Sequence, residues 1–253
     1  MRSAARAPLA CWRLLRALLH ILSGLWIVWR RFPRLSAGQR ENQVQAWARA
    51  MLHLLGIALQ VQGRPVAQGP ALMVCNHISW LDILVLHAGR HCRFVSKSEI
   101  RRWPLIGRLA TAAGTLYIER SRRRDAMRVV HDMAASLRAG DIVAVFPEGT
   151  TGDGRELLPF HANLLQAAIS APAPVQPVAL KFVDARSGQR SLAPCYIGDD
   201  SLLGSLWRTL TAPPIVALVC YGELQAPQGQ ERRAWAASLQ AAVDDLAEGA
   251  RRE

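Results

Sequence analysis

Short apolar runs alternate with amphipathic segments along most of this 253-residue chain. The apolar runs are rich in β-branched side chains, as buried strands are. They lie at residues 57–62, 71–75, 93–96, 141–146 and 215–221. Helical periodicity marks three further segments, at residues 43–55, 125–139 and 231–251. This alternation, without an internal repeat or a long linker, predicts a single α/β domain with a mixed, partly parallel sheet flanked by helices.

The first 40 residues break this pattern. They hold eight arginines and no acidic residue, and within them residues 17–29 form an apolar run. That run is shorter than the ~20 residues that cross a bilayer. Arg13 and Arg16 lie at helical spacing on one side of it. Three tryptophans are placed to lie at the level of lipid head groups: Trp12, Trp26 and Trp29.

We therefore expect residues 1–40 to form a basic, hydrophobic membrane-anchoring segment, followed by one domain at residues 41–253. The segment is expected to be an amphipathic or shallowly inserted helix that is attracted to anionic lipid. A single membrane-spanning helix is an alternative. A cleaved signal peptide is another, but the small-residue cleavage site that it needs is missing before Trp29.

The net charge of +12 admits a nucleic-acid-binding protein as an alternative from another class. The arginines are not interleaved with stacking aromatic residues, however, and no recognition motif is present, so no nucleic-acid partner is expected. Only Lys97 and Lys181 among the 31 basic residues are lysine, which indicates genome composition more than selection for a partner. The five cysteines form no Cys-x-x-Cys pair, and His87 with His91 and Cys92 lacks the further ligands of a metal site. No metal is therefore expected.

The strongest candidate chemistry follows the apolar run at residues 71–75. His77 and Asp82 are five residues apart, and on a regular helix two such residues point about 140° away from each other. They meet if His77 lies on the loop that leaves the strand and Asp82 lies in the first helical turn. A carboxylate on one ring nitrogen would then stabilise the imidazolium that forms as the other nitrogen accepts a proton. Alternatively, Ser79 and Asp82 are only a helix start signal, and His77 is a loop histidine.

A second cluster follows the run at 141–146. Glu148, Thr150 and Thr151 can bind a hydroxylated ligand, and Gly149 permits close backbone approach. An ordinary Gly- and Thr-rich turn is the alternative, and His161 can either line the same pocket or start a helix.

Between the two clusters, Gly114 is expected to open a strand that delivers Arg120 at its far end. The planar guanidinium of Arg120 suits an anionic head group, although runs of arginine are usually solvated surface.

The order and spacing of these residues resemble the glycerolipid acyltransferase family that includes the 1-acylglycerol-3-phosphate acyltransferases. That family carries a His-(four residues)-Asp motif, a Gly…Arg motif, a Phe-Pro-Glu-Gly-Thr motif and a later Val-Pro-like strand. The matching positions, within about residues 55–222, are His77 and Asp82, Gly114 and Arg120, residues 146–150 and residues 175–178.

The resemblance implies that His77 is the general base and that Asp82 is its partner. The residues implied to bind substrate are Asn76, Gly114, Arg120, Glu148, Gly149, Thr150 and Thr151. The implied reaction moves a fatty acyl group from acyl-CoA or acyl carrier protein to the free hydroxyl of a lysolipid. The expected acceptor is 1-acyl-sn-glycerol-3-phosphate, which gives phosphatidic acid.

Transfer is expected to be direct, without a cofactor. Cys75 beside His77 is a conceivable nucleophile, but a small buried residue at the strand end is favoured. Membrane lipids are expected partners, and the cytoplasmic face of the inner membrane is the expected location.

One position departs from the family pattern. The third motif usually continues with arginine, whereas this chain has Thr151. Losing a charge-assisted contact weakens a phosphate site by roughly 1.5–3 kcal/mol. Either Arg120 holds the phosphate alone, or Arg155 reaches in, or the acceptor lacks a phosphate. The last option points to the branch of the family that acylates lyso-ornithine lipid, which the Thr-Thr-Gly-Asp-Gly run at residues 150–154 resembles.

Overall fold

The computed structural model describes residues 6–118, 123–226, 229 and 231–249. Over these residues seven strands form one sheet in the order β1-β7-β6-β2-β5-β3-β4. The strands are β1 (Ile57–Gln62), β2 (Ala71–Cys75), β3 (Arg93–Lys97), β4 (Leu116–Ile118), β5 (Ile142–Val145), β6 (Val175–Asp184) and β7 (Ile215–Tyr221). β6 and β7 are antiparallel, and the other neighbours are parallel. The predicted α/β domain with a mixed, partly parallel sheet is confirmed.

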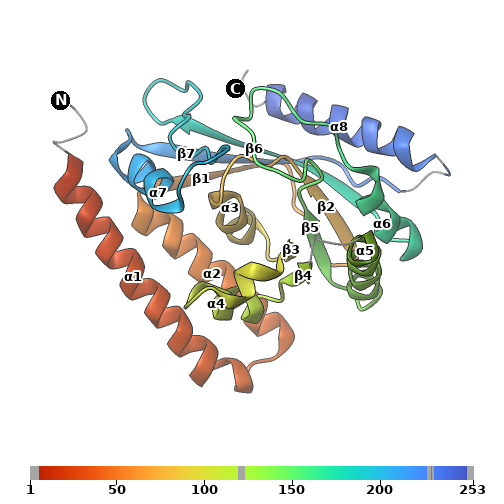
Figure 1. The fold of residues 1–253 in the computed structure, drawn as a ribbon, viewed down its shortest axis with the longest axis horizontal. Coiled ribbons are helices and arrows are strands. Elements are labelled where there is room, and N and C mark those ends of the chain that lie inside the picture. Colours follow the sequence, from red (N-terminus) through yellow and green to blue (C-terminus); the bar gives the residue numbers. More distant parts are fainter. Residues whose placement is uncertain (1–5, 119–122, 227–228, 230, 250–253) are drawn as a thin grey trace.

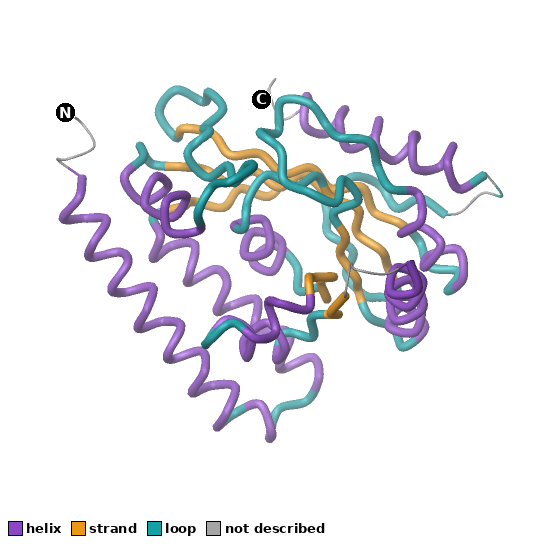
Figure 2. The backbone as a smooth tube through the Cα atoms, in the orientation of Figure 1, coloured by secondary structure: helices purple, strands orange, loops and turns teal. Residues whose placement is uncertain are grey.

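Helices cover both faces of the sheet (Figure 1 and Figure 2). One face carries α2 (Ala37–Leu55) and α3 (Leu81–Gly89), and the other carries α5 (Arg123–Arg138), α6 (Gln166–Ser170) and α8 (Arg232–Gly249). The remaining helices are α1 (Ala7–Arg30), α4 (Ile106–Ala112), α7 (Leu202–Thr211) and the short helices η2 (Phe32–Arg34), η3 (Ser98–Arg102) and η4 (Ala162–Leu165).

Strand β2 shows why its sequence has no polar face. Met73 and Cys75 belong to the core beneath α2 and α3, whereas Leu72 and Val74 belong to the core beneath α5 and α8. Successive side chains point to opposite sides of a strand, so a strand covered by helices on both sides must be apolar throughout.

Parallel pairing decides where the loops meet. β2, β5, β3 and β4 all run in the same direction, so their carboxyl ends lie at one edge of the sheet. The segments that leave these ends contain the loop after Cys75 and the loop after Val145. The two motif clusters, about 70 residues apart in sequence, are adjacent at the edge where α/β sheets usually bind ligands.

The region around Gly114 differs from its prediction. Strand β4 is only three residues long, and Gly114 precedes it in a turn with a backbone φ of +84°. A Cβ at this position would lie 3.0 Å from Nε of Arg93, whose guanidinium donates to the Gly114 carbonyl at 2.8 Å. Glycine is therefore required by the turn, which lies between α4 and β4.

Helix α1 is 24 residues long, which corresponds to about 36 Å. By length and composition it could cross a membrane, with a mean hydropathy of 1.4 over its most apolar window. Its buried residues are small and seven apart, Ala10, Ala17 and Gly24, and small side chains let neighbouring helices approach closely. Gly24 lies against Trp47 of α2. The helix begins ten residues before the predicted apolar run at 17–29, with a proline in its first turn, where proline is tolerated.

A reciprocal contact fastens α1 to α2. The rings of His20 and Trp47 stack with centroids 4.9 Å apart, Nε1 of Trp47 donates to the His20 carbonyl at 3.1 Å, and Nε2 of His20 lies 3.0 Å from the Trp47 carbonyl. The predicted division at residue 40 falls inside α2, which begins at Ala37 behind a Ser36 capping box. The division into an anchoring segment and a domain stays a prediction.

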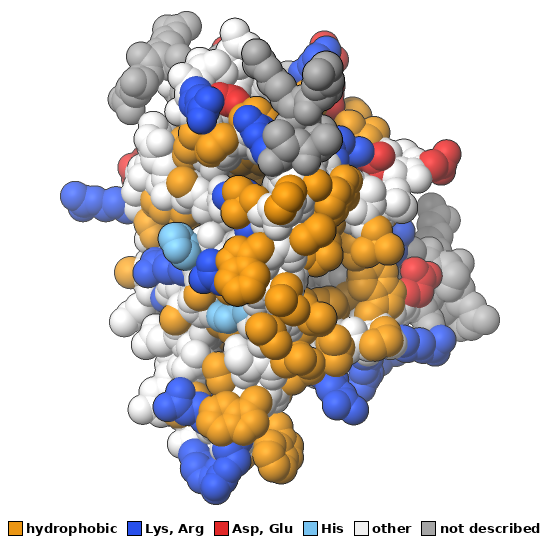
Figure 3. Space-filling view, turned by 90° about the vertical axis from the view of Figure 1, so that its left-hand side faces the viewer, with side chains coloured by type: hydrophobic (Ala, Val, Ile, Leu, Met, Phe, Trp, Pro, Cys, Tyr) orange, Lys and Arg blue, Asp and Glu red, His pale blue; other side chains and the backbone are white. Residues whose placement is uncertain are grey.

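The outer side of α1 is apolar and exposed, and we call it the α1 face (Figure 3). Its exposed large side chains are Leu9, Trp12, Leu14, Leu15, Leu18, Leu19, Leu22, Trp26 and Trp29. Leu203 and Trp207 of the neighbouring helix α7 are also exposed. Basic side chains lie around the apolar area in Figure 3.

Candidate active site

His77 and Asp82 meet at the carboxyl end of β2. Nδ1 of His77 donates to Oδ2 of Asp82 at 2.7 Å, and Asp82 is fully buried whereas the His77 side chain is 20% exposed. His77 lies on the loop and Asp82 is the second residue of α3, which is the placement that brings residues five apart together. This bond favours the tautomer that has its proton on Nδ1, so Nε2 carries the lone pair that can accept a proton.

Asp82 is also a helix start signal. Its Oδ2 accepts from the backbone N–H groups of Ile78 at 2.7 Å and Ser79 at 2.9 Å. The hydroxyl of Ser79 accepts from the Leu81 N–H and donates to the Pro194 carbonyl at 2.5 Å. The two interpretations of the motif are therefore compatible, because the carboxylate that holds the loop N–H groups just before α3 is the one that orients His77.

Glu148 joins the two loops, which we call the catalytic loops (residues 76–80 and 146–152). Its Oε1 accepts from the His77 N–H at 2.6 Å, and its Oε2 accepts from the Leu158 N–H at 2.9 Å. The Gly152 N–H donates to the His77 carbonyl at 2.8 Å. Burial raises the pKa of Glu148 above its usual value, while the two N–H bonds act in the opposite direction. Both backbone groups of His77 are thus held by the second loop.

The ring of Phe146 covers His77. The centroids are 3.9 Å apart and the rings are 9° from parallel. Phe146 stacks in turn on Phe94 of β3, with centroids 5.9 Å apart. From the sequence, Phe146 ends a strand and begins the Phe-Pro-Glu-Gly-Thr motif without a role of its own, and Phe94 does not stand out. Parallel pairing of β3 with β5 places Phe94 opposite Ala144, two residues before Phe146, a signal that needs the strand order.

The Gly-Thr turn brings His161 to the site. Gly149 has a φ of +72°, and a Cβ there would lie 3.1 Å from the imidazole of His161. His161 is also the residue before η4, as predicted, and its lining of the acceptor pocket stays a prediction. Thr150 is exposed, whereas the hydroxyl of Thr151 donates to the Tyr196 carbonyl. That bond, with the Tyr196 N–H donating to the Ile78 carbonyl at 3.1 Å, ties residues 194–196 behind the catalytic loops.

The other predicted substrate-binding residues are placed differently. The Asn76 amide is buried and pairs with both backbone groups of Leu180, at 3.0 and 2.7 Å, so it fixes the loop to β6. The Gly114 carbonyl accepts from Arg93 in the turn before β4, as described above. Arg120 lies outside the described residues. Arg155 is exposed, 3.4 Å from Asp153. Substrate contact by these residues stays a prediction.

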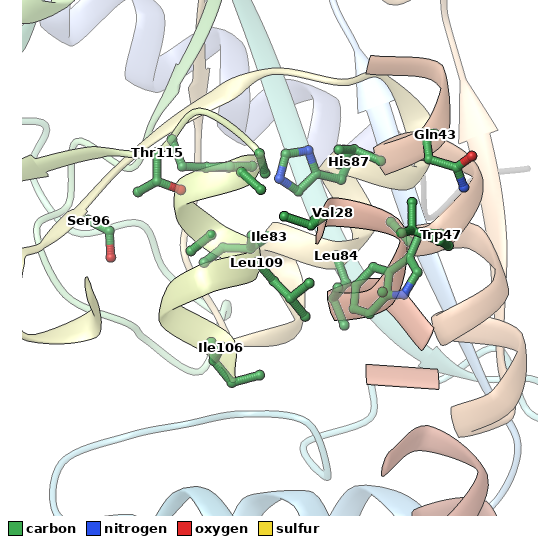
Figure 4. Close-up of a pocket in the computed structure, with 18 of the residues that line it drawn as sticks. Val28, Gln43, Trp47, Ile83, Leu84, His87, Ser96, Ile106, Leu109 and Thr115 are labelled. Carbon is green, nitrogen blue, oxygen red and sulfur yellow. The ribbon is translucent and has the colours of Figure 1, made fainter. Parts of the chain in front are cut away.

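An apolar cavity of about 180 Å³ lies between α1, α2, α3 and α4 (Figure 4). Its wall includes Val28 and Trp47 from the first two helices, Leu84 from α3 and Leu109 from α4. Phe94 also lines it. The stack of His77, Phe146 and Phe94 therefore connects the proton-accepting ring to the wall of an apolar cavity.

Cys75 does not have the setting of a nucleophile. The side chain is fully buried, and burial raises the pKa of its thiol well above the usual value, so the thiol is protonated at neutral pH.

His87 and His91 stack on one another, with centroids 5.3 Å apart. Among the described residues no group of three His, Cys, Asp or Glu side chains could hold a metal ion. The absence of a metal stays a prediction.

The fold and the site define a class. A mostly parallel sheet with a buried histidine–aspartate pair at its carboxyl edge, beside an apolar cavity, is the architecture of an α/β enzyme that handles a substrate with a long apolar part.

Comparison with known proteins identifies the family. Residues 58–181 match the family model described as Acyltransferase. The chain is 38% identical over 200 residues to a 1-acyl-sn-glycerol-3-phosphate acyltransferase of Neisseria gonorrhoeae, which covers 77% of this chain and 76% of that protein. It is 37% identical over 204 residues to a lyso-ornithine lipid O-acyltransferase of Pseudomonas aeruginosa, covering 81% and 78%. The chain belongs to the acyltransferase family, and the resemblance seen in its motifs is confirmed.

A solved structure supports the fold. The crystal structure of the 1-acyl-sn-glycerophosphate (LPA) acyltransferase PlsC from Thermotoga maritima superimposes with a TM-score of 0.72 over 98% of both chains. At 18% sequence identity this likeness concerns the fold, N-terminal helices included.

Proposed function

We propose that this enzyme moves a fatty acyl group from an acyl thioester, acyl-CoA or acyl carrier protein, to the free hydroxyl of a lysolipid. The acceptor we favour is 1-acyl-sn-glycerol-3-phosphate, with phosphatidic acid as product. The observation that carries the proposal is the His77–Asp82 pair, whose imidazole stacks on Phe146 and through it on Phe94, a residue of the cavity wall. Identity to relatives named for two lysolipid acceptors supports the substrate class.

The chain's own residues supply the proton transfers. Nε2 of His77 takes the proton of the acceptor hydroxyl as the oxygen attacks the thioester carbonyl. Asp82 stabilises the imidazolium, which then gives the proton to the departing thiolate, so atoms and charge balance without a protein nucleophile. Phe146 stacked on the imidazole and Glu148 on its backbone keep the ring in position for both steps.

Two apolar regions of the enzyme are suited to the apolar parts of the substrates. The cavity between α1 and α4 is suited to an acyl tail, because its wall is apolar and begins two stacked rings from His77. The α1 face is suited to the lipid surface from which the acceptor comes, with tryptophans and basic residues at the head-group level. We place the enzyme on the cytoplasmic face of the inner membrane, where thioester donors are made.

A second acceptor is favoured by one observation. Thr151 occupies the position where the family pattern has arginine, and its hydroxyl donates a hydrogen bond to the Tyr196 carbonyl. It therefore does not replace a phosphate-binding cation. A lyso-ornithine lipid, whose head group is an amino acid, is the alternative acceptor. Replacing Thr151→Arg is expected to raise transfer to the phosphate acceptor if the phosphate is bound at this loop.

The test is acyl transfer by the detergent-purified enzyme. Lysophosphatidic acid and lyso-ornithine lipid are offered side by side, each with acyl-CoA and with acyl carrier protein donors. His77→Ala is expected to remove transfer, whereas His53→Ala, which changes an exposed histidine of α2, is the matched control. Transfer to neither acceptor, or equal transfer by His77→Ala, would show that the proposed function or its base is wrong.

A further inference from the structure

Helix α7 buries polar side chains and exposes apolar ones. Leu203 is 78% exposed, and Trp207, one turn later on the same side of the helix, is 42% exposed. Ser205 and Thr209 lie on the opposite side and are 0% and 3% exposed. Of the leucines in this helix, only Leu210 belongs to the core. A helix on the surface of a soluble protein normally places its apolar side chains toward the core and its polar ones toward water.

The buried polar side chains of α7 are held by directional bonds. The hydroxyl of Ser205 accepts from Nε1 of Trp80 at 3.2 Å and donates to the Cys195 carbonyl at 3.4 Å. Oγ1 of Thr209 lies 3.2 Å from the Ala193 carbonyl. Rolling the helix to bury its exposed side would break these bonds inside the protein, which is unfavourable. The orientation of α7, with its apolar side outward, is therefore fixed.

The same bonds connect α7 to the catalytic loops. Trp80 is the last residue of the first of these loops, and its neighbour Ser79 donates to the Pro194 carbonyl. The Tyr196 N–H donates to the carbonyl of Ile78 in the same loop at 3.1 Å. Helix α7, the segment at residues 193–196 and the first catalytic loop thus form one bonded unit.

Helix α7 is also a neighbour of α1. It lies beside the amino-terminal part of α1 (Figure 1), and Arg6 donates to the carbonyl of Thr211 at 3.5 Å. The helix contains no acidic residue, and its one arginine, Arg208, is paired with Asp200 at 2.8 Å. No uncompensated charge on α7 therefore opposes contact with an apolar surface.

Taking the acceptor to be a lipid in a bilayer, a step that rests on the proposed function, we propose that α7 is a second lipid-docking element of the enzyme. Its outer side, which we call the α7 face (Leu202, Leu203 and Trp207), enters the head-group level of the bilayer, where an indole is favoured. Because α7 is bonded to the first catalytic loop, this contact holds the loop at the surface from which the lysolipid comes.

A bilayer fits the α7 face better than a protein partner does. An exposed apolar patch marks one or the other. The adjacent α1 face is apolar, carries three exposed tryptophans and has basic side chains around it (Figure 3), as lipid-binding helices do. One bilayer can cover both helices at once. A second copy of this chain is the competing occupant, and the experiment separates the two.

The first experiment places a fluorophore on the α7 face. Cys11 is exposed and the other four cysteines are buried, so Leu203→Cys is made together with Cys11→Ser and labelled with an environment-sensitive dye. Vesicles of phosphatidylcholine and phosphatidylglycerol are expected to raise the emission and shift it to shorter wavelength. Met127→Cys, at a position of α5 that is 76% exposed, is the matched control and should not respond.

The second experiment changes the chemistry of the α7 face. Leu203→Glu is expected to lower partition of the full chain into the same vesicles by about tenfold or more, the factor that burial of one leucine contributes. The ratio of the transfer rate with acceptor in vesicles to the rate with acceptor in detergent should fall with it. Met127→Glu introduces the same charge at a position equally exposed and should keep the wild-type partition and rate ratio.

The outcomes distinguish this proposal from the proposed function. If the dye at position 203 does not respond and Leu203→Glu partitions like wild type, α7 is not a lipid-docking element, while His77-dependent transfer in detergent leaves the proposed function intact. A dye response that needs no vesicles and grows with protein concentration would show that a second copy covers the α7 face, and would overturn the proposal. If no acceptor is acylated at all, the proposed function fails, and the dye response and the partition alone decide whether α7 meets the bilayer.

Discussion

The catalytic loops and the apolar cavity are neighbours with opposite construction. In the loops, short hydrogen bonds fix the polar groups: Oδ2 of Asp82 accepts from three donors, and Glu148 accepts from the N–H groups of His77 and Leu158. In the cavity, helices meet through apolar side chains, and Nδ1 of His87 has no hydrogen-bond partner among the described residues. Hydrogen bonds have directions and fix atoms, whereas apolar contacts fix volumes. The loops therefore position a proton acceptor, whereas the cavity limits the volume of what it can hold.

This difference predicts separate effects on kinetics. A change in the catalytic loops disturbs the position of groups that act in the transition state, so it should lower kcat. A change in the cavity wall alters space and helix packing, so it should act on stability and on the KM of the donor. Four substitutions can break or sharpen this contrast.

The largest effect is expected from Asp82→Asn. The amide is similar in size but has no charge to stabilise the His77 imidazolium, so kcat should fall by roughly 10²–10⁴-fold, the contribution typical of general acid–base catalysis. KM should change little. Asp132→Asn, at a half-exposed carboxylate of α5 with only a long contact to Arg128, is the control and should leave kcat unchanged. A loss below tenfold with intact folding would show that Asp82 serves only to start α3.

The next effect is expected from Gly149→Ala. A non-glycine residue at a φ of +72° costs about 1–2 kcal/mol, and the new methyl group would press on His161 at 3.1 Å. Both stability and kcat should fall, as followed by urea unfolding and initial rates. Gly140→Ala separates the two causes, because Gly140 has a φ of +88° but open space around its Cβ position. It should lose stability while its kcat stays at the wild-type value.

The features that can be predicted from the sequence follow the same division between local and long-range contacts. Most strands, the helices α2, α5 and α8, and the meeting of His77 with Asp82 are predictable, because periodicity and spacing within a short segment carry them. Glu148 could be placed near the site by its motif, but its bonds to His77 and Leu158 depend on the strand order, which local patterns do not contain. Asn76 shows the same gap: its residue type suggests a ligand contact, yet its partner is Leu180, about 100 residues away.

The cavity was not predicted at all. Its wall comes from four helices and from β3, and each contributing side chain reads as an ordinary core residue on its own helix. The burial of the His87 ring likewise depends on how Phe94 and His91 pack around it. The composition of residues 1–40 is enough to predict an anchoring segment. The contact of His20 with Trp47 cannot be predicted in this way, because it forms only when α1 packs on α2.

On the cavity side, Gly24→Ala should act on stability first. A Cβ at Gly24 would lie 2.6 Å from Nε1 of Trp47, the atom that donates to the His20 carbonyl, and 3.3 Å from Leu109. Overpacking of this kind costs roughly 1–3 kcal/mol. Thermal unfolding and donor KM should therefore change more than kcat. Gly38→Ala, with nothing near its Cβ position in the first turn of α2, should instead be neutral or stabilising by less than about 1 kcal/mol. A collapse of kcat in Gly24→Ala would contradict the separation of the two regions.

The smallest effect is a pH dependence carried by Glu148. Burial raises the pKa of this carboxyl in the folded state, so as pH rises the unfolded chain loses this proton first. The stability that the neutral carboxyl contributes is fully present below the ordinary glutamate pKa, and it is lost as pH rises through the raised folded value. The slope within that window cannot exceed about 1.4 kcal/mol per pH unit.

Activity should follow the opposite trend over the same window. Protonation turns one carboxyl oxygen toward donation, although His77 and Leu158 both present N–H groups to it, so kcat should fall as pH drops below the raised pKa. Glu148→Gln should flatten the pH dependence of the unfolding free energy, and Glu156→Gln, at an exposed carboxylate of the same segment, should keep the wild-type profile. Urea titrations and initial rates from pH 4 to 8 test both trends. If stability and activity rose together with pH, the Glu148 carboxylate would be better paired than its burial allows, and the desolvation argument would fail.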